Sequence, residues 1–188
     1  MVALNEEALN LRFPIADAVF DSVPEIAEDM KQRPNGEPSH TYLRDLLKSG
    51  TPEEAITFCA YLLATRESVW WGHECLAHFA NALAERDPQL LDLVENWVRE
   101  PNEDTRYAAM EAGLACEPKT AGAWLSLAAG WSGGSMSERE QPPVPPPPHL
   151  SSRMVNIAIL TTVAHLDRSH RSTALKECID IAFTIVEH

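Results

Sequence analysis

A run of prolines constrains the fold more than any other stretch of the sequence. Six of the seven residues from Pro142 to Pro148 are proline. Proline has no backbone N–H and its ring clashes with the preceding helical turn, so this run cannot belong to a helix and favours the extended polyproline form. Gly133 and Gly134, shortly before it, are typical of a helix end. We therefore expect a Gly/Pro-rich strap, residues 131–150, within an otherwise helical chain.

Helical signals flank the strap on both sides, and no segment has the apolar alternation of a β-strand. Thr51-Pro52 and Asp87-Pro88 each place a capping residue before a proline, which is typical of a helix start. We predict an all-α fold of seven to eight helices, arranged as antiparallel pairs and without a sheet. The expected helices span residues 40–48, 51–64, 66–85, 89–100, 102–115, 119–129, 153–166 and 171–186.

The first 38 residues have the least regular pattern. An apolar stretch, 13–20, is expected to lie on the domain as an anchor. Ser22 and Glu25 have the spacing of a capping box, which favours a short helix to about residue 32. The segment 33–38 contains two prolines and a glycine and indicates a turn or linker. We predict an irregular N-terminal segment and no separate domain.

A weak internal repeat has an offset of 36 residues. It aligns Thr51-Pro52 with Asp87-Pro88, and it also aligns the pairs Tyr61/Trp97, Leu62/Val98 and Trp71/Tyr107. Each unit would be a helix pair, and the period is close to that of HEAT repeats. Both a partly HEAT-like stack and an irregular helical bundle fit this pattern.

The segment after the strap carries a strongly apolar helix. Residues 153–166 include Met154, Val155, Ile159 and Val163 and have almost no polar face. A helix that is apolar all round is buried all round. Its packing partners must come from the helices before the strap, so we predict a single helical domain over residues 1–188.

Charge and composition exclude several classes of protein. The chain has 28 acidic and 15 basic residues and a formal net charge of −13, which disfavours binding to nucleic acid or to anionic membranes. No signal peptide and no membrane-spanning run is evident, so we expect a cytoplasmic protein. The four cysteines form no C-x-x-C pair and are predicted to be structural: Cys59, Cys75, Cys116 and Cys178.

One sequence is superficially similar to a zinc-protease motif. His73-Glu74 is followed by His78, one position later than the H-E-x-x-H pattern requires. Residues five apart lie about 140° apart around a helix, so the two imidazoles cannot bind one metal ion. We predict no metal site, no cofactor and no catalytic residue here.

Trp70 and Trp71 offer a candidate binding surface. On a helical projection they lie at the two edges of a polar strip that contains Glu74 and His78. Paired indoles beside a carboxylate and an imidazole could form a ligand groove. Simple burial of both tryptophans in the core is the alternative, and the pattern favours it.

The strap allows two interpretations. Arg139, Pro142 and Pro145 match the basic-plus-PxxP pattern that SH3 grooves bind. In the other interpretation, which we favour, the prolines dock internally on Trp124, Trp131 or Trp71 and close a groove between the two halves of the domain.

Three motifs together resemble a known family: Val69-Trp70-Trp71, then Trp131-Ser132-Gly133-Gly134-Ser135, then Pro142-Pro143-Val144-Pro145-Pro146-Pro147-Pro148. The chain is similar over residues 42–166 to a family of uncharacterised bacterial helical proteins, some of them encoded near type VI secretion clusters. The resemblance implies a bacterial cytoplasmic accessory protein and no catalytic residues.

The leading functional hypothesis is a non-enzymatic protein-interaction or adaptor module that uses the strap, with an unidentified protein partner. The alternative is a small-molecule-binding protein or enzyme whose site lies under the strap, near Trp70, Glu74, His78 and Trp131. The chain is expected to be a monomer or a small homo-oligomer.

Overall fold

The computed structural model describes residues 11–186, and within this range it contains helices but no β-strand. Ile15 and Pro38 form an isolated bridge. The all-α prediction is confirmed, whereas the ten α-helices within residues 11–186 exceed the predicted seven to eight. They are α1 (Asp17–Ser22), α2 (Ile26–Asp29), α3 (Ser39–Lys48), α4 (Glu54–Leu62), α5 (Thr65–His78), α6 (Asp87–Arg99), α7 (Glu103–Ala115), α8 (Ala121–Gly130), α9 (Leu150–His165) and α10 (Arg171–Val186), and Ala80–Ala82 form a 3-10 helix, η1.

The additional helices lie in the N-terminal segment, where one short helix to residue 32 was predicted. That helix stops at Asp29, because the backbone N–H groups of Lys31 and Gln32 donate to the Glu54 carboxylate at 3.1 and 2.9 Å. α1 and α2 each bury an apolar side chain completely, Val19 and Ile26. The segment is thus held on the helical core through both apolar packing and backbone hydrogen bonds.

The long helix predicted over residues 66–85 is also shorter than expected. α5 ends at His78, and Phe79 leaves the helical conformation with φ −102° and ψ 38°. The Phe79 ring packs edge-on against the His78 imidazole, with 4.7 Å between ring centroids. The remainder of the predicted segment forms the short helix η1 before α6 begins.

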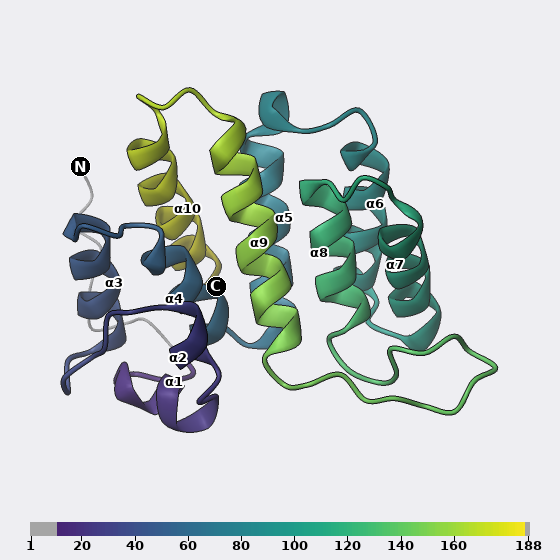
Figure 1. Cartoon of the computed structure of the whole chain (residues 1–188), viewed down its shortest axis with the longest axis horizontal. Coiled ribbons are helices and arrows are strands. Elements are labelled where there is room, and N and C mark those ends of the chain that lie inside the picture. The colour runs from purple at the N-terminus through teal and green to yellow at the C-terminus, as the bar shows by residue number, and fades with distance from the viewer. Residues whose placement is uncertain (1–10, 187–188) are drawn as a thin grey trace.

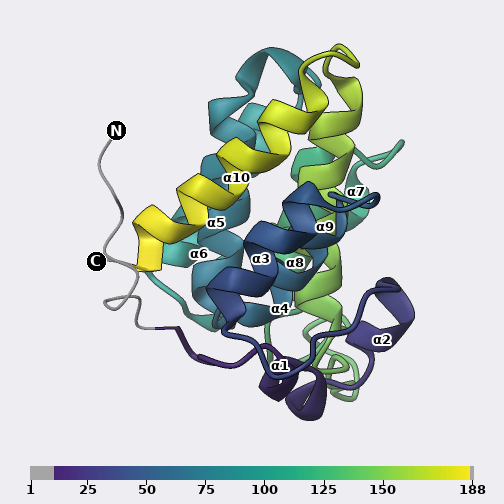
Figure 2. The ribbon, with the colours of Figure 1, turned by 90° about the vertical axis from the view of Figure 1, so that its left-hand side faces the viewer.

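α9 is central to the arrangement, as its apolar sequence predicted. It packs against α4, α5, α8 and α10. Figure 1 shows α6, α7 and α8 on one side of α9 and α3, α4 and α10 on the other. Turned by 90°, Figure 2 shows α3 and α10 side by side at the face nearest the viewer. One contiguous cluster of buried apolar residues includes side chains from all ten α-helices.

The helix pairs of the predicted repeat are present as α4–α5 and α6–α7. The aromatic residues that the repeat aligns are all buried: Tyr61, Trp71, Trp97 and Tyr107. The structural equivalence to HEAT repeats stays a prediction.

The Asp87 side chain has a role that the sequence pattern did not indicate. Instead of capping its own helix, its carboxylate accepts hydrogen bonds from the Thr120 hydroxyl and the Gly122 N–H at the start of α8. It therefore connects α6 with α8.

Candidate partner-binding site

The strap leaves the core where α8 ends. Trp131 is half-buried against the core at the end of α8. Gly134 has a φ of +61°, a conformation that side chains with a Cβ rarely adopt. A Cβ on Gly134 would also lie 2.9–3.0 Å from the Arg106 guanidinium, whereas one on Gly133 would meet nothing within 4 Å. Of the predicted glycine pair, Gly134 is therefore the one that the backbone requires.

Arg106 on α7 anchors the base of the strap. Its side chain is buried, and its guanidinium donates to the Gly130 carbonyl at 2.6 Å and to the Ser135 carbonyl at 3.0 Å. Its other nitrogens bind both carboxylate oxygens of Glu103 at 2.8 Å. The Glu103 hydrogen bonds raise the pKa of Arg106, and Arg106 lowers the pKa of Glu103. This ion pair neutralises a buried cation while it holds two backbone carbonyls.

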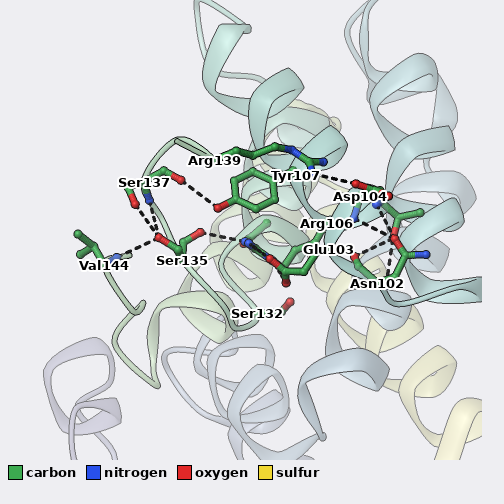
Figure 3. A network of polar contacts seen from close by, with 12 residues as sticks. Asn102, Glu103, Asp104, Arg106, Tyr107, Ser132, Ser135, Ser137, Arg139 and Val144 are labelled. Carbon is green, nitrogen blue, oxygen red and sulfur yellow. Dashed lines mark hydrogen bonds and ion pairs between the residues drawn. The ribbon is translucent and has the colours of Figure 1, made fainter. Parts of the chain in front are cut away.

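The Ser135 hydroxyl closes the strap into a loop. It accepts hydrogen bonds from the Ser137 N–H at 3.1 Å and from the Val144 N–H at 2.9 Å. The Met136 N–H donates to the Val144 carbonyl at 2.8 Å, and the Ser137 hydroxyl donates to the Pro142 carbonyl at 2.7 Å. The two ends of residues 136–144 are therefore held together by hydrogen bonds (Figure 3).

Tyr107 and Asp104, which lie beside Arg106 on α7, form a second anchor for the strap. The Tyr107 hydroxyl donates to the Ser137 carbonyl at 3.3 Å. The Arg139 guanidinium lies over the Tyr107 ring at 4.5 Å and binds the Asp104 carboxylate at 2.8 Å. Figure 3 shows Arg139, Tyr107 and Ser137 converging from the two segments. Arg139, predicted as the cation of a PxxP motif, is thus engaged with α7.

Most of the prolines of the strap are exposed to solvent. Pro142 and Pro145 are exposed, and Pro146 is half-buried. Val144 has a relative solvent exposure of 49%. The strap docks on α7 through serine, arginine and backbone groups. The strap accepts a hydrogen bond from the aromatic residue Tyr107, whereas docking of the prolines on Trp124, Trp131 or Trp71 stays a prediction.

A shallow hollow of about 370 Å³ adjoins the strap and α7. Its apolar lining includes Met110, Leu114 and Met136, and Leu114 is 46% exposed. The surrounding surface of α7 and the strap is acidic, with five exposed carboxylates: Glu103, Asp104, Glu111, Glu138 and Glu140. An apolar hollow with an acidic rim therefore continues the surface formed by the exposed prolines.

The structure separates the residues of the other predicted site. Trp70 and Glu74 line an open hollow with Ile181, Thr184 and Ile185 of α10, and no strap residue contributes to its lining. Trp71 is fully buried and its indole N–H donates to the Cys178 carbonyl at 2.7 Å, so the burial alternative is correct for this residue.

His78 points to a different neighbour. It pairs with Glu177 at 3.2 Å, near the end of α5 that lies farthest from the strap (Figure 1). Trp70, Glu74, His78 and Trp131 therefore do not form one pocket beneath the prolines.

Metal-binding and thiol chemistry have no visible site in the described part of the chain. Residues 11–186 contain no group of three or more His, Cys, Asp or Glu side chains able to hold a metal ion. All four cysteines are buried and unpaired, and burial raises the pKa of the Cys59 and Cys75 thiols. Buried thiols with a raised pKa are unreactive, which agrees with the predicted structural role.

The main anchors of the strap were missed at the level of sequence. The candidate site residues predicted from the sequence do not include Arg106 or Ser135, and Tyr107 stands out only as the repeat partner of Trp71. One signal was present. Arg106 begins a helical stretch of mostly small residues, Tyr107-Ala-Ala-Met-Glu-Ala-Gly113, where a lone cation needs an acceptor.

Comparison with known proteins gives one match. No curated protein and no solved structure matches the chain significantly. None of the helices within residues 11–186 has the length and apolar character that crossing a bilayer requires. A family model described as "Family of unknown function (DUF6931)" matches residues 42–186. Since this match spans most of the 188 residues, the chain belongs to that family of unknown function.

Proposed function

We propose that the chain is a non-enzymatic adaptor that binds a partner protein through the strap and the adjoining face of α7. The observation that carries this proposal is a proline run that is anchored at its base and in which every residue from Pro142 to Pro148 except Pro146 is exposed. Such a segment loses little conformational entropy when it docks, because its backbone is already extended and held. As part of this proposal, the chain acts in the bacterial cytoplasm and is associated with type VI secretion.

The chemistry of the surface defines the kind of partner. Exposed prolines and Val144 favour a groove lined with aromatic side chains, as in other modes of polyproline recognition. The carboxylates around the hollow favour basic side chains beside that groove. Met110 and Met136 add a flexible apolar surface that adapts to a partner's shape. The expected partner is thus an aromatic-lined, locally basic protein surface.

Affinity capture from source-cell extract with three forms of the chain tests the adaptor function. We expect wild type to retain a defined protein that the Pro142→Ala/Pro145→Ala variant loses. Pro101→Ala is the matched control, because Pro101 is exposed but lies outside the strap. Retention of the same proteins by all three forms would rule the strap out as the binding surface.

A second candidate function is small-molecule binding in the hollow lined by Trp70 and Glu74. The supporting observation is that the indole and the carboxylate line one open hollow of about 470 Å³ with two isoleucines. A cationic, partly apolar ligand suits this lining. Quenching of tryptophan fluorescence by such ligands, lost in Trp70→Leu but kept in Trp124→Leu, is the expected result. Equal quenching in both variants would exclude this hollow.

A further inference from the structure

The Tyr107 ring on α7 contacts two guanidinium groups. The Arg106 guanidinium lies 4.3 Å from the ring centroid, and the Arg139 guanidinium lies 4.5 Å from it. A cation within about 6 Å of an aromatic centroid is attracted electrostatically to the face of the ring. Tyr107 is only 7% exposed, so its ring is almost completely covered.

The two arginines differ in how firmly they are held. Arg106 is buried and donates to the backbone carbonyls of Gly130 and Ser135. The Arg139 side chain comes from the strap and is 48% exposed, and its ion-pair partner Asp104 is 87% exposed. Figure 3 shows the Arg139 side chain running along the Tyr107 ring towards Asp104. Exposed ion pairs contribute little to stability, so Arg139 can leave the ring at a small cost in free energy.

Release of the Arg139 side chain does not require the strap to detach from α7. The hydrogen bond of 3.3 Å from the Tyr107 hydroxyl to the Ser137 carbonyl does not involve Arg139. Arg139 is also flanked in the sequence by Glu138 and Glu140, which are both exposed. A displaced guanidinium therefore stays close to carboxylates and to water, while the anchored part of the strap keeps its place.

We propose that the Tyr107 ring and the Asp104 carboxylate form a binding site for an arginine side chain of the partner protein, which Arg139 occupies until that partner binds. The incoming guanidinium stacks on the ring and pairs with the carboxylate, as Arg139 does in the free chain. A planar guanidinium suits both contacts better than a lysine ammonium, because it stacks on rings and can bind two carboxylate oxygens at once. This inference rests on the proposed function of the strap and names the side chain that its acidic surface recognises.

Arg139 is an intramolecular competitor in this arrangement, so its removal should strengthen the binding of an added guanidinium. The lost competition amounts to one exposed ion pair and one cation–π contact. The combined strength of two such contacts corresponds to a change of about five- to tenfold in affinity.

Two-dimensional ¹H–¹⁵N NMR of the full chain tests the site without a partner protein. The probe is N-acetyl-arginine amide, and its control is N-acetyl-citrulline amide, in which a neutral urea group replaces the guanidinium. In Arg139→Gln, the arginine probe is expected to shift the amide signals of Asp104, Tyr107 and Ser137 saturably. Its affinity should be about five- to tenfold higher than for wild type. The citrulline probe should leave these signals unchanged.

Two further variants locate the binding. Arg99→Gln is the matched control, because Arg99 is 75% exposed and also loses an ion pair, that with Glu95 at 2.6 Å. It should bind the arginine probe as wild type does. Arg139→Gln/Asp104→Asn removes the competitor and the carboxylate together, and its affinity should fall about fivefold or more below that of Arg139→Gln. The dispersion of the NMR spectra verifies that all variants are folded.

The proposal is overturned if Arg139→Gln and Arg99→Gln have equal affinity for the arginine probe. Equal shifts with the citrulline probe, or an affinity that Asp104→Asn leaves unchanged, would also overturn it. Failure of the adaptor function gives a different pattern. In that case affinity capture retains no strap-dependent protein, whereas the arginine probe still binds at Tyr107.

Discussion

Gly134 and Arg106 determine how the strap leaves α8. The first provides the left-handed backbone turn, and the second fills the space that a Cβ at Gly134 would occupy. Arg106 also holds the carbonyl groups on either side of that turn, those of Gly130 and Ser135. A buried carbonyl that loses its hydrogen-bond donor lowers the free energy of unfolding by about 1–3 kcal/mol. The two contacts are coupled because one side chain, Arg106, supplies the donor to both carbonyls.

Alanine substitutions at Gly133 and Gly134 test whether the left-handed backbone conformation at Gly134 matters for stability. Gly134→Ala should lower the free energy of unfolding by about 1–3 kcal/mol, because alanine disfavours a φ of +61° and its Cβ would contact Arg106. Gly133→Ala should change it by less than about 0.5 kcal/mol, since nothing lies near its Cβ position. Urea denaturation provides both values. Equal destabilisation by the two variants would show that the turn at Gly134 does not constrain the strap.

At the scale of helices, a polar contact joins three elements that are far apart in the sequence. The Tyr61 hydroxyl on α4 donates to Asp29 of α2 at 2.5 Å, and Arg153 of α9 binds the same carboxylate at 2.9 Å. Tyr42 on α3 contrasts with this arrangement, because its buried hydroxyl has no partner within the described structure.

Removal of the Tyr61 hydroxyl and removal of the Tyr42 hydroxyl should therefore change the free energy of unfolding differently. Tyr61→Phe is expected to lower the free energy of unfolding by about 1 kcal/mol through the lost hydrogen bond to Asp29. Tyr42→Phe should leave it unchanged or raise it by up to about 1 kcal/mol, since it removes a buried polar group without a partner. Thermal and urea unfolding of both variants measure the difference. A larger loss for Tyr42→Phe than for Tyr61→Phe would contradict this assignment of partners.

Most of the helices could be predicted because their signals are local. Helical periodicity with proline and capping residues predicted α3, α4 and α6 to α10 to within a few residues, and the apolar sequence of α9 indicated its central place. The end of α2 depends on Glu54, more than twenty residues away, and local patterns contain no such information.

The candidate site was predictable only in part for the same reason. The proline run and Gly134 stand out in the sequence, but the contacts of the strap with Arg106 and Tyr107 join residues about 30 positions apart. The helical projection placed Trp70 and Glu74 near one another, and the structure places both in one hollow. It could not show that the strap lies at the other end of α5 from His78.

At the scale of the whole molecule, stability should fall at alkaline pH because of the buried tyrosines. Burial raises the pKa of Tyr42 to about 12, and burial with the hydrogen bond to Asp29 raises that of Tyr61 further. In the unfolded chain both ionise near pH 10. Their contribution to stability is therefore complete below about pH 10 and is lost as the pH rises towards 12.

Urea unfolding between pH 9 and about pH 12 checks this dependence. The wild-type free energy of unfolding should decrease over the upper part of this range, and the decrease should be smaller in Tyr42→Phe/Tyr61→Phe. An identical decrease in the double variant would assign the alkaline sensitivity to other groups.

At the scale of the whole molecule, α9 connects the two sides of the fold. It packs on α8, which leads into the strap, and on α10 at the other side of the molecule (Figure 1).

The central claim is that the strap is held in one conformation before any partner binds. Backbone ¹⁵N relaxation at Ser135, Ser137 and Val144 tests this claim most directly. Order parameters of about 0.85, similar to those of α9, are predicted for the wild-type chain, with a clear decrease in Arg106→Ala. Values below about 0.6 in the wild-type chain would contradict the claim, because a strap that moves so freely cannot be a preformed binding surface.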